Sequence, residues 1–206
     1  MASRQEKSTF DKILLQGIRA GQIPARTEEA RQWFREKARK ETSLTDAKLI
    51  REDTSRLQDK SVIGKMFFYM YDPKTKVSLP HYDMFPLIFP IERYKDGFLG
   101  LNCHYLPLPL RAKLMDALYT ITNNERFDES TKLQISYSIL KNASQFSLFT
   151  PCVKRYLTSH VRSRFIAVHP SEWDIALFLP VANFQKQSEK EVWAESLRKL
   201  GMSGKK

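Results

Sequence analysis

The chain has 206 residues, of which 42% are hydrophobic and thirteen are Phe, so we expect one folded core, or a core domain with a helical extension. Its formal net charge of +11 favours a polyanion such as nucleic acid as the partner. The first residues are charged and prolines interrupt the longest apolar stretches, which argues against a secretion signal and a membrane span. The two cysteines, Cys103 and Cys152, form no CxxC pair and predict a reduced, intracellular protein.

The first sixty residues predict a helical arm followed by a linker. Apolar side chains recur at helical spacing between residues 10 and 20, and Ser8 or Thr9 can cap the first turn. A second helix is expected over residues 27–40, where two glutamates follow a threonine at its start. Residues 41–60 are polar and rich in charge, so we expect a linker or an arm that a partner orders.

From residue 63 the sequence becomes aromatic and β-branched, which predicts short strands. Asp96 followed by Gly97 indicates a tight hairpin between two of them. The expected strands lie at residues 66–71, 86–91, 91–94 and 98–102. The fold class is therefore predicted to be α+β, with a small antiparallel sheet or partly open barrel over about residues 63–105, packed with helices.

Beyond residue 109 the pattern is again mainly helical. Helices are expected at residues 110–121, 130–143, 152–159, 173–177 (capped by Ser171) and 187–200. A further strand at residues 165–168 is expected to return to the sheet. We therefore divide the chain into a helical N-terminal arm and linker (1–60), an α+β core domain (61–183), and a C-terminal helix with a basic tail (184–206).

The charge is concentrated in residues 130–171, which hold six Lys or Arg and no Asp or Glu. Cations mixed with hydroxyls and aromatics suit phosphate contacts, and a tyrosine among them can stack on an exposed base. The candidate nucleic-acid-binding residues are Lys141, Lys154, Arg155, Tyr156, His160, Arg162 and Arg164. Two simpler interpretations stay open: the positive charge serves solubility alone, or Tyr156 belongs to the core while the cations project outward.

Metal and catalytic sites find little support in the sequence. His81, Asp83, Cys103 and His104 match no familiar ligand spacing, and we expect Cys103 to be a buried thiol. The seven glycines form neither GxxxxGK[ST] nor GxGxxG, and the strand region holds too few carboxylates outside turns for a metal-dependent nuclease. We therefore predict no metal, no cofactor and no enzymatic activity.

Several segments of the chain together resemble proteins of contractile-tailed phages of the T-even type, and among these the DNA end protector family, a minor head-completion component. The resemblance spans roughly residues 62–182. It is carried by residues 64–69, 71–74, 79–83, 85–87, 97–106, 151–157 and 171–176.

This resemblance implies a virion protein, delivered with the genome into the host cytoplasm, that shields the ends of packaged linear DNA from host exonuclease without catalysis. Its expected partners are duplex DNA termini, bound without sequence preference, and other virion proteins; the oligomeric state stays open. The alternative is a neck, tail or baseplate component that acts through protein contacts. A regulator of internal duplex DNA is a third interpretation, which the absence of helix-turn-helix spacing disfavours.

Overall fold

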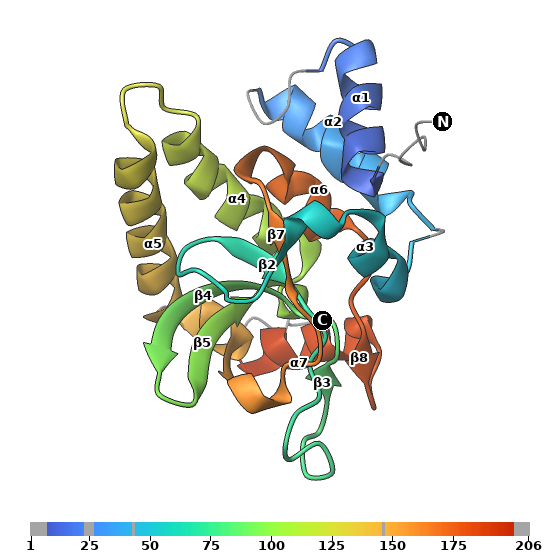
Figure 1. Cartoon of the computed structure of the whole chain (residues 1–206), viewed down its shortest axis with the longest axis vertical. Coiled ribbons are helices and arrows are strands. Elements are labelled where there is room, and N and C mark those ends of the chain that lie inside the picture. The colour runs from blue at the N-terminus through green and yellow to red at the C-terminus, as the bar shows by residue number, and fades with distance from the viewer. Residues whose placement is uncertain (1–7, 23–26, 43, 146, 200–206) are drawn as a thin grey trace.

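The computed structural model describes residues 8–22, 27–42, 44–145 and 147–199 (Figure 1). A six-stranded antiparallel sheet lies at the centre, in the order β1-β7-β2-β4-β5-β6, and helices cover one of its faces. The strands are β1 (Leu57–Gln58), β2 (Met66–Phe68), β4 (Leu87–Tyr94), β5 (Gly97–Asn102), β6 (Val153–Leu157) and β7 (Phe165–Val168). The α+β class and the open antiparallel sheet are therefore confirmed.

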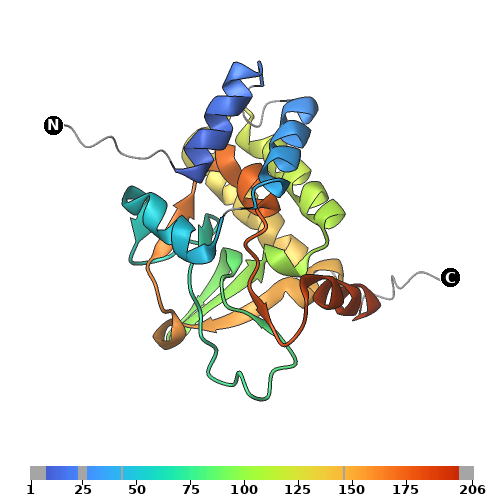
Figure 2. The same cartoon turned by 90° about the vertical axis from the view of Figure 1, so that its right-hand side faces the viewer.

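Both N-terminal helices form as predicted: α1 spans Thr9–Arg19 and α2 spans Glu28–Arg39. The Ser8 side chain caps α1 by accepting a hydrogen bond from a backbone N–H of the first turn, and Thr27 caps α2 in the same way. Phe10 of α1 and Phe34 of α2 are buried in the main core. Because α2 packs against α6 (Trp173–Phe178), these helices cover a helix that lies far along the sequence (Figure 2).

Residues 41–60 are more structured than their polar composition predicts. They contain α3 (Asp46–Glu52), a short 3-10 helix, η1 (Thr54–Arg56), and β1, which pairs with β7. The composition predicted a linker because a two-residue strand has no periodicity of its own, and its partner lies more than 100 residues away in the sequence. The proposed division of the chain at residues 60 and 183 stays a prediction.

The predicted hairpin is confirmed, with β4 and β5 joined at the register Tyr94↔Gly97. The two strands expected on either side of residue 91 are a single strand, β4. A register shift between Pro90 and Glu92 explains why proline is accepted inside it, since a β-bulge relaxes the requirement for a backbone donor.

The helix expected at residues 152–159 is wrong. Its place is taken by the end of η3 (Ser147–Cys152), then β6, then η4 (Thr158–His160). Pairing with β5 and the burial of Tyr156 outweigh local helical propensity here. With β6 and β7 included, the sheet extends well beyond the predicted residues 63–105.

The connection from β6 to β7 runs from one edge of the sheet to the second strand from the other edge. On the way Val161 forms a β-bridge with Tyr71, and the Arg162 N–H donates to the Met70 carbonyl at 2.8 Å. This connection, which holds three of the seven candidate binding residues (His160, Arg162 and Arg164), therefore lies across one end of the sheet.

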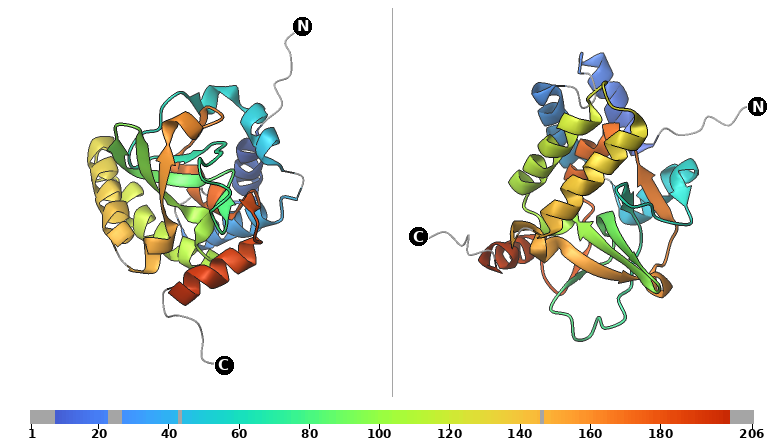
Figure 3. Two further views of the ribbon diagram at one scale, coloured as in Figure 1. Left: turned by 90° about the horizontal axis from the view of Figure 1, so that it is seen from below. Right: turned by 90° about the vertical axis from the view of Figure 1, so that its left-hand side faces the viewer.

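The two faces of the sheet are packed differently. One face forms the main core beneath α4 (Leu108–Thr122), α5 (Glu129–Gln145) and α6, and Figure 3 shows α4 and α5 side by side. The opposite face holds a smaller, aromatic cluster. Its aromatic members are Phe67, Tyr69, Tyr71, Phe98, Tyr156 and Phe165. Both later helices, α4 and α5, match their predicted positions.

A second, two-stranded sheet pairs β3 (Tyr82–Asp83) with β8 (Phe184–Gln185), and α7 (Glu189–Lys199) follows it. The last helix and the strand at residues 165–168 are as predicted, whereas Ser171 lies inside a 3-10 turn that His169 caps. In the part of the chain that the structure describes, no helix is both long and apolar enough to cross a membrane.

Candidate nucleic-acid interface

Three of the predicted binding residues lie along the β6–β7 segment, and each is paired with a carboxylate from another part of the chain. We call Arg155, Arg162 and Arg164 the arginine row. The pairs are Arg155 with Asp96, Arg162 with Asp72 (3.9 Å) and Arg164 with Asp59 (2.8 Å). The acid-free stretch of sequence is therefore not an acid-free surface.

The arginine row remains open to solvent despite these pairs. The side chains of Arg162 and Arg164 are 54% and 51% exposed, and that of Arg155 is 34% exposed. Ion pairs at such positions stabilise a fold by about 0–1 kcal/mol, because water screens the charges. A phosphate can therefore replace the aspartate as the partner of each guanidinium at little cost to stability.

Arg155 also lies over the ring of Tyr94, with its guanidinium carbon 4.1 Å from the ring centroid. Tyr94 is 43% exposed at the end of the β4–β5 hairpin. Tyr94 is not among the residues predicted from the sequence, because it lies about sixty positions before Arg155 and outside the basic segment. The predicted hairpin at Asp96 and Gly97 was the available signal, since it brings the end of β4 beside β6 through β5.

Tyr156 does not occupy the position that a stacking residue requires. It is 3% exposed, its ring packs on Phe98 and Tyr71, and its hydroxyl accepts a hydrogen bond from the Asn102 amide at 3.1 Å. The expected stacking on a base is corrected, and the alternative interpretation, that Tyr156 belongs to the core, agrees with this packing. Alternation along β6 turns this side chain to the aromatic cluster.

Lys154 is a poor phosphate ligand in this structure. Its ammonium lies 4.0 Å from the centroid of the Tyr105 ring, and burial lowers its pKa to about 8. Its ammonium is half-buried against an aromatic ring and is therefore less accessible to a phosphate than the exposed guanidinium groups, although a pKa of about 8 leaves it mostly charged at neutral pH.

The two remaining predicted residues differ in position. His160 is half-buried, and its Nδ1 lies 2.8 Å from the Asp72 carbonyl, so it holds the β6–β7 connection against the chain after Tyr71. Lys141 is exposed on α5, which packs mainly against α4 and η3, apart from this connection. The structure therefore places the arginine row and His160 on β6 and the connection that follows it, and Lys141 apart from them on α5.

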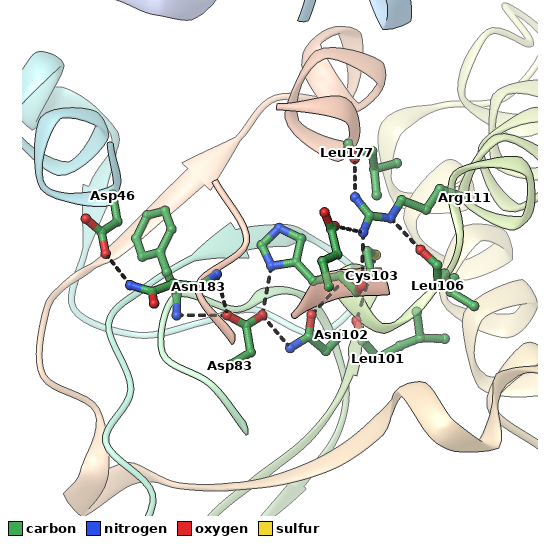
Figure 4. A network of polar contacts seen from close by, with 12 residues as sticks. Asp46, Asp83, Leu101, Asn102, Cys103, Leu106, Arg111, Leu177 and Asn183 are labelled. Carbon is green, nitrogen blue, oxygen red and sulfur yellow. Dashed lines mark hydrogen bonds and ion pairs between the residues drawn. The ribbon is translucent and has the colours of Figure 1, made fainter. Parts of the chain in front are cut away.

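Two of the residues considered for a metal site, Asp83 and His104, form a buried structural link (Figure 4). The Asp83 carboxylate accepts hydrogen bonds from the Asn102 amide at 3.0 Å, the Phe85 N–H at 3.0 Å and the Asn183 N–H at 3.3 Å, and its Oδ2 lies 2.8 Å from His104 Nδ1. Burial raises the pKa of Asp83, but His104 and the hydrogen bonds outweigh it and the net shift is downward. This carboxylate therefore joins the β3–β8 sheet to the end of β5.

The Cys103 thiol is free and buried, as predicted, and burial raises its pKa, so it is a poor nucleophile. His81 faces Glu195 at 3.5 Å instead of joining Asp83. Among the described residues, no cluster of three or more His, Cys, Asp or Glu side chains is arranged to hold a metal ion.

Arg111 is a second buried charge, and nothing in the sequence distinguishes it from an ordinary helical arginine. Its guanidinium donates to the carbonyls of Leu106, Leu177 and His104 and to the Glu189 carboxylate. It thereby ties α4 to α6 and α7 (Figure 4).

A family model described as the phage T4 terminal DNA protecting protein matches residues 7–196. The chain belongs to this family. Comparison with curated proteins and with solved structures found no match. The family match reaches beyond the residues 62–182 of the sequence resemblance and includes the N-terminal helices and most of α7.

Within the terminal DNA protecting family, a surface that binds phosphates without reading bases is the chemistry that the name requires. The arginine row has this character: three guanidinium groups, exposed aspartate partners and one exposed aromatic ring. The neck, tail or baseplate alternative gains no support from the family match.

Proposed function

We propose that the chain binds the ends of linear duplex DNA in the virion through the arginine row and protects them from exonuclease by occlusion, without catalysis. The observation that carries this proposal is the arginine row itself. Arg155 lies on β6 and the other two arginines lie on the connection that follows it, and the carboxylate partners that they have in the described part of the chain are themselves partly or largely exposed. The family to which the chain belongs supports DNA ends as the target.

When a phosphate binds at this surface, it replaces an aspartate as the partner of an arginine. Each aspartate is the ion-pair partner of its arginine in the free protein, and a phosphate offers more charge and the bidentate geometry that a guanidinium favours. Binding also releases condensed counterions from the DNA, which supplies affinity that does not depend on sequence. A protein that must cover any terminus needs this indifference to sequence.

The absence of catalysis is part of the proposal. The carboxylate and imidazole of Asp83 and His104 are enclosed in the fold and bonded to each other, so they cannot reach a phosphodiester. The remaining partners that we propose are other virion proteins, which would hold the protein near the DNA until the genome enters the host.

An exonuclease-protection assay tests the proposal. The purified protein is incubated with linear duplex DNA at physiological ionic strength, and digestion by a processive exonuclease is followed over time. The variant Arg155→Glu/Arg162→Glu/Arg164→Glu should lose protection and binding.

The matched control reverses three exposed cations on the helices, Lys12→Glu/Lys37→Glu/Lys113→Glu, which changes the net charge by the same amount. It should retain most of the protection. Equal loss in both variants would show that net charge, and not the arginine row, drives binding. Absence of protection by the unmodified protein would refute the function itself.

A further inference from the structure

The loop of residues 73–80, which we call the apex loop, projects from the body of the molecule between Tyr71 and β3, at the bottom of Figures 1 and 2. Residues 74–78 are all exposed, and Val77 near its tip is 89% exposed. The other large hydrophobic side chains exposed in the described chain are less so, with Ile18 at 57%. A single exposed aliphatic residue is ordinary. Val77 is unusual because the loop that carries it is held in place by several hydrogen bonds.

The apex loop is held in place by hydrogen bonds within itself and by hydrogen bonds from Lys186. The backbone N–H groups of Ser78 and Leu79 both donate to the Thr75 carbonyl, at 3.0 and 3.2 Å. The Lys186 ammonium donates to the carbonyls of Val77 and Leu79, at 2.8 and 2.6 Å. Lys186 lies just after β8 and has a φ of 70°, a left-handed conformation that is uncommon for lysine.

The base of the loop is joined to the surface that holds the arginine row. The Asp72 N–H donates to the His160 carbonyl at 3.1 Å, and the His160 ring donates to the Asp72 carbonyl at 2.8 Å. Asp72 is also the carboxylate that faces Arg162. The tip is therefore presented on an ordered support, so that little conformational entropy is lost when it meets a partner.

Cations lie within the apex loop and beside its base. Lys74 and Lys76 belong to the loop, Arg162 faces its base, and Asp72 is the only carboxylate in residues 72–80 and 158–164. Lys76 pairs with this carboxylate at 2.8 Å in an exposed position that water screens. The surface thus combines one projecting aliphatic side chain with positive charge in the same loop and beside its base.

A duplex terminus has the complementary chemistry. Its last base pair exposes a flat, apolar face that the interior of a duplex buries by stacking, and phosphates lie at the rim of that face. Aliphatic side chains are known to pack against base pairs where a step is opened. An internal site offers phosphates alone.

We propose that Val77 packs against the exposed face of the terminal base pair while Lys74, Lys76 and Arg162 contact the phosphates beside it. This inference rests on the proposed function and deepens it. The arginine row supplies affinity for any duplex, and the apex loop supplies the preference for an end.

The test compares binding to a blunt-ended duplex with binding to the same duplex closed at both ends by hairpin loops. The unmodified protein should bind the open duplex more tightly. Val77→Ser should lower this preference about tenfold, as expected for exposing a side chain of this size, and leave the affinity for the closed duplex unchanged. Val77→Leu should retain the preference, and Ile18→Ser, on α1 at the other end of the molecule, is the matched control.

The possible results separate the inference from the function. If Val77→Ser keeps the full preference for open ends, the inference is refuted and the proposed function stands. If it weakens binding to both duplexes equally, Val77 does not read the end and the inference is also refuted. If the unmodified protein neither prefers open ends nor protects them, the proposed function fails together with the inference. Thermal melting confirms that each variant is folded.

Discussion

At the scale of single residues, each member of the arginine row has an aspartate partner that, under the proposed function, competes with DNA for its guanidinium. Arg164 is the clearest case, because it contacts both Asp59 and the Leu57 carbonyl, at 2.8 and 2.7 Å. Arg155 is held by Asp96 on one side and lies over Tyr94 on the other. Under the proposed function, these carboxylates release the arginines when a phosphate binds.

Replacing these aspartates should therefore tighten DNA binding. We expect Asp59→Asn and Asp96→Asn each to raise the affinity for duplex DNA about twofold to fivefold, since an exposed ion pair is worth about 0–1 kcal/mol. Fluorescence anisotropy with labelled duplex measures the change. Glu29→Gln, at an exposed position on α2, removes the same charge elsewhere and should have a smaller effect. Unchanged affinity in the two Asp variants would contradict the exchange of partners.

The buried position of Lys154 makes the stability of the fold depend on pH. Burial lowers its pKa to about 8 in the folded protein, whereas the unfolded value is 10.5. The folded state thus loses this proton first, so the contribution of Lys154 to stability rises as the pH increases from about 8 to 10.5.

Lys154→Met should therefore melt at a higher temperature than the unmodified protein at pH 7, and this difference should shrink at pH 9.5, which lies between the two pKa values. Comparing the two proteins at each pH cancels the opposing titration of the buried tyrosines and cysteines. A difference that does not depend on pH would show that Lys154 is not held in a costly charged state.

At the scale of elements, the β5–β6 pair positions the arginine row. Gly97 begins β5 opposite Leu157, and a Cβ at this position would lie 1.9 Å from the Tyr156 carbonyl oxygen. The two strands approach this closely because the residue has no side chain. Gly97 therefore allows both the hairpin turn and the close approach of β6, the strand that carries Arg155.

Gly97→Ala should lower the free energy of unfolding by about 1–3 kcal/mol, because the backbone of β6 has to move away. Gly100→Ala in the same strand is the matched control. Its nearest contacts are the side chains of Ile88 and Tyr156 at 3.2 Å, which can shift slightly, so a smaller loss is expected. Denaturant unfolding of both variants measures the difference, and equal losses would show that the close approach at Gly97 is not the cause.

At the scale of the whole molecule, the net charge of +11 does not translate directly into a DNA-binding surface. Many cations are paired across the fold, as Arg35 is with Asp174 and Arg56 with Glu172, and these pairs connect the N-terminal helices and η1 to the segment around α6. Part of the positive charge therefore stabilises the packing of the N-terminal segment on the rest of the chain.

The dependence of DNA binding on salt should reflect the arginine row and not the net charge. With three phosphate contacts, the logarithm of the affinity should fall with the logarithm of the salt concentration with a slope of about −3. Replacing one arginine of the row by glutamine should make the slope shallower by about one. Titrations at several salt concentrations test this, and a slope between about −4 and −5 would indicate that Lys74 and Lys76 of the apex loop also contact phosphates.

Much of the fold follows from local pattern. The capped N-terminal helices, the β4–β5 hairpin and the two central helices were predictable because capping residues, turn residues and periodicity act over a few positions. The segment at residues 152–159 was not, because its local pattern also suits a helix and only pairing with β5 decides for a strand. β1 was not predicted because it has two residues and its partner strand, β7, lies more than 100 residues away in the sequence.

For the function, composition and local motifs were enough to predict the α+β class, the positive charge, the family and the arginines that form the row. The tertiary structure alone decided how those residues are used. It gave each arginine of the row an aspartate from a distant segment, turned Tyr156 inward, brought Tyr94 beside Arg155 and placed the apex loop next to the row. The physical reason is that charge and propensity belong to residues, whereas exposure and pairing depend on which segments the sheet brings together.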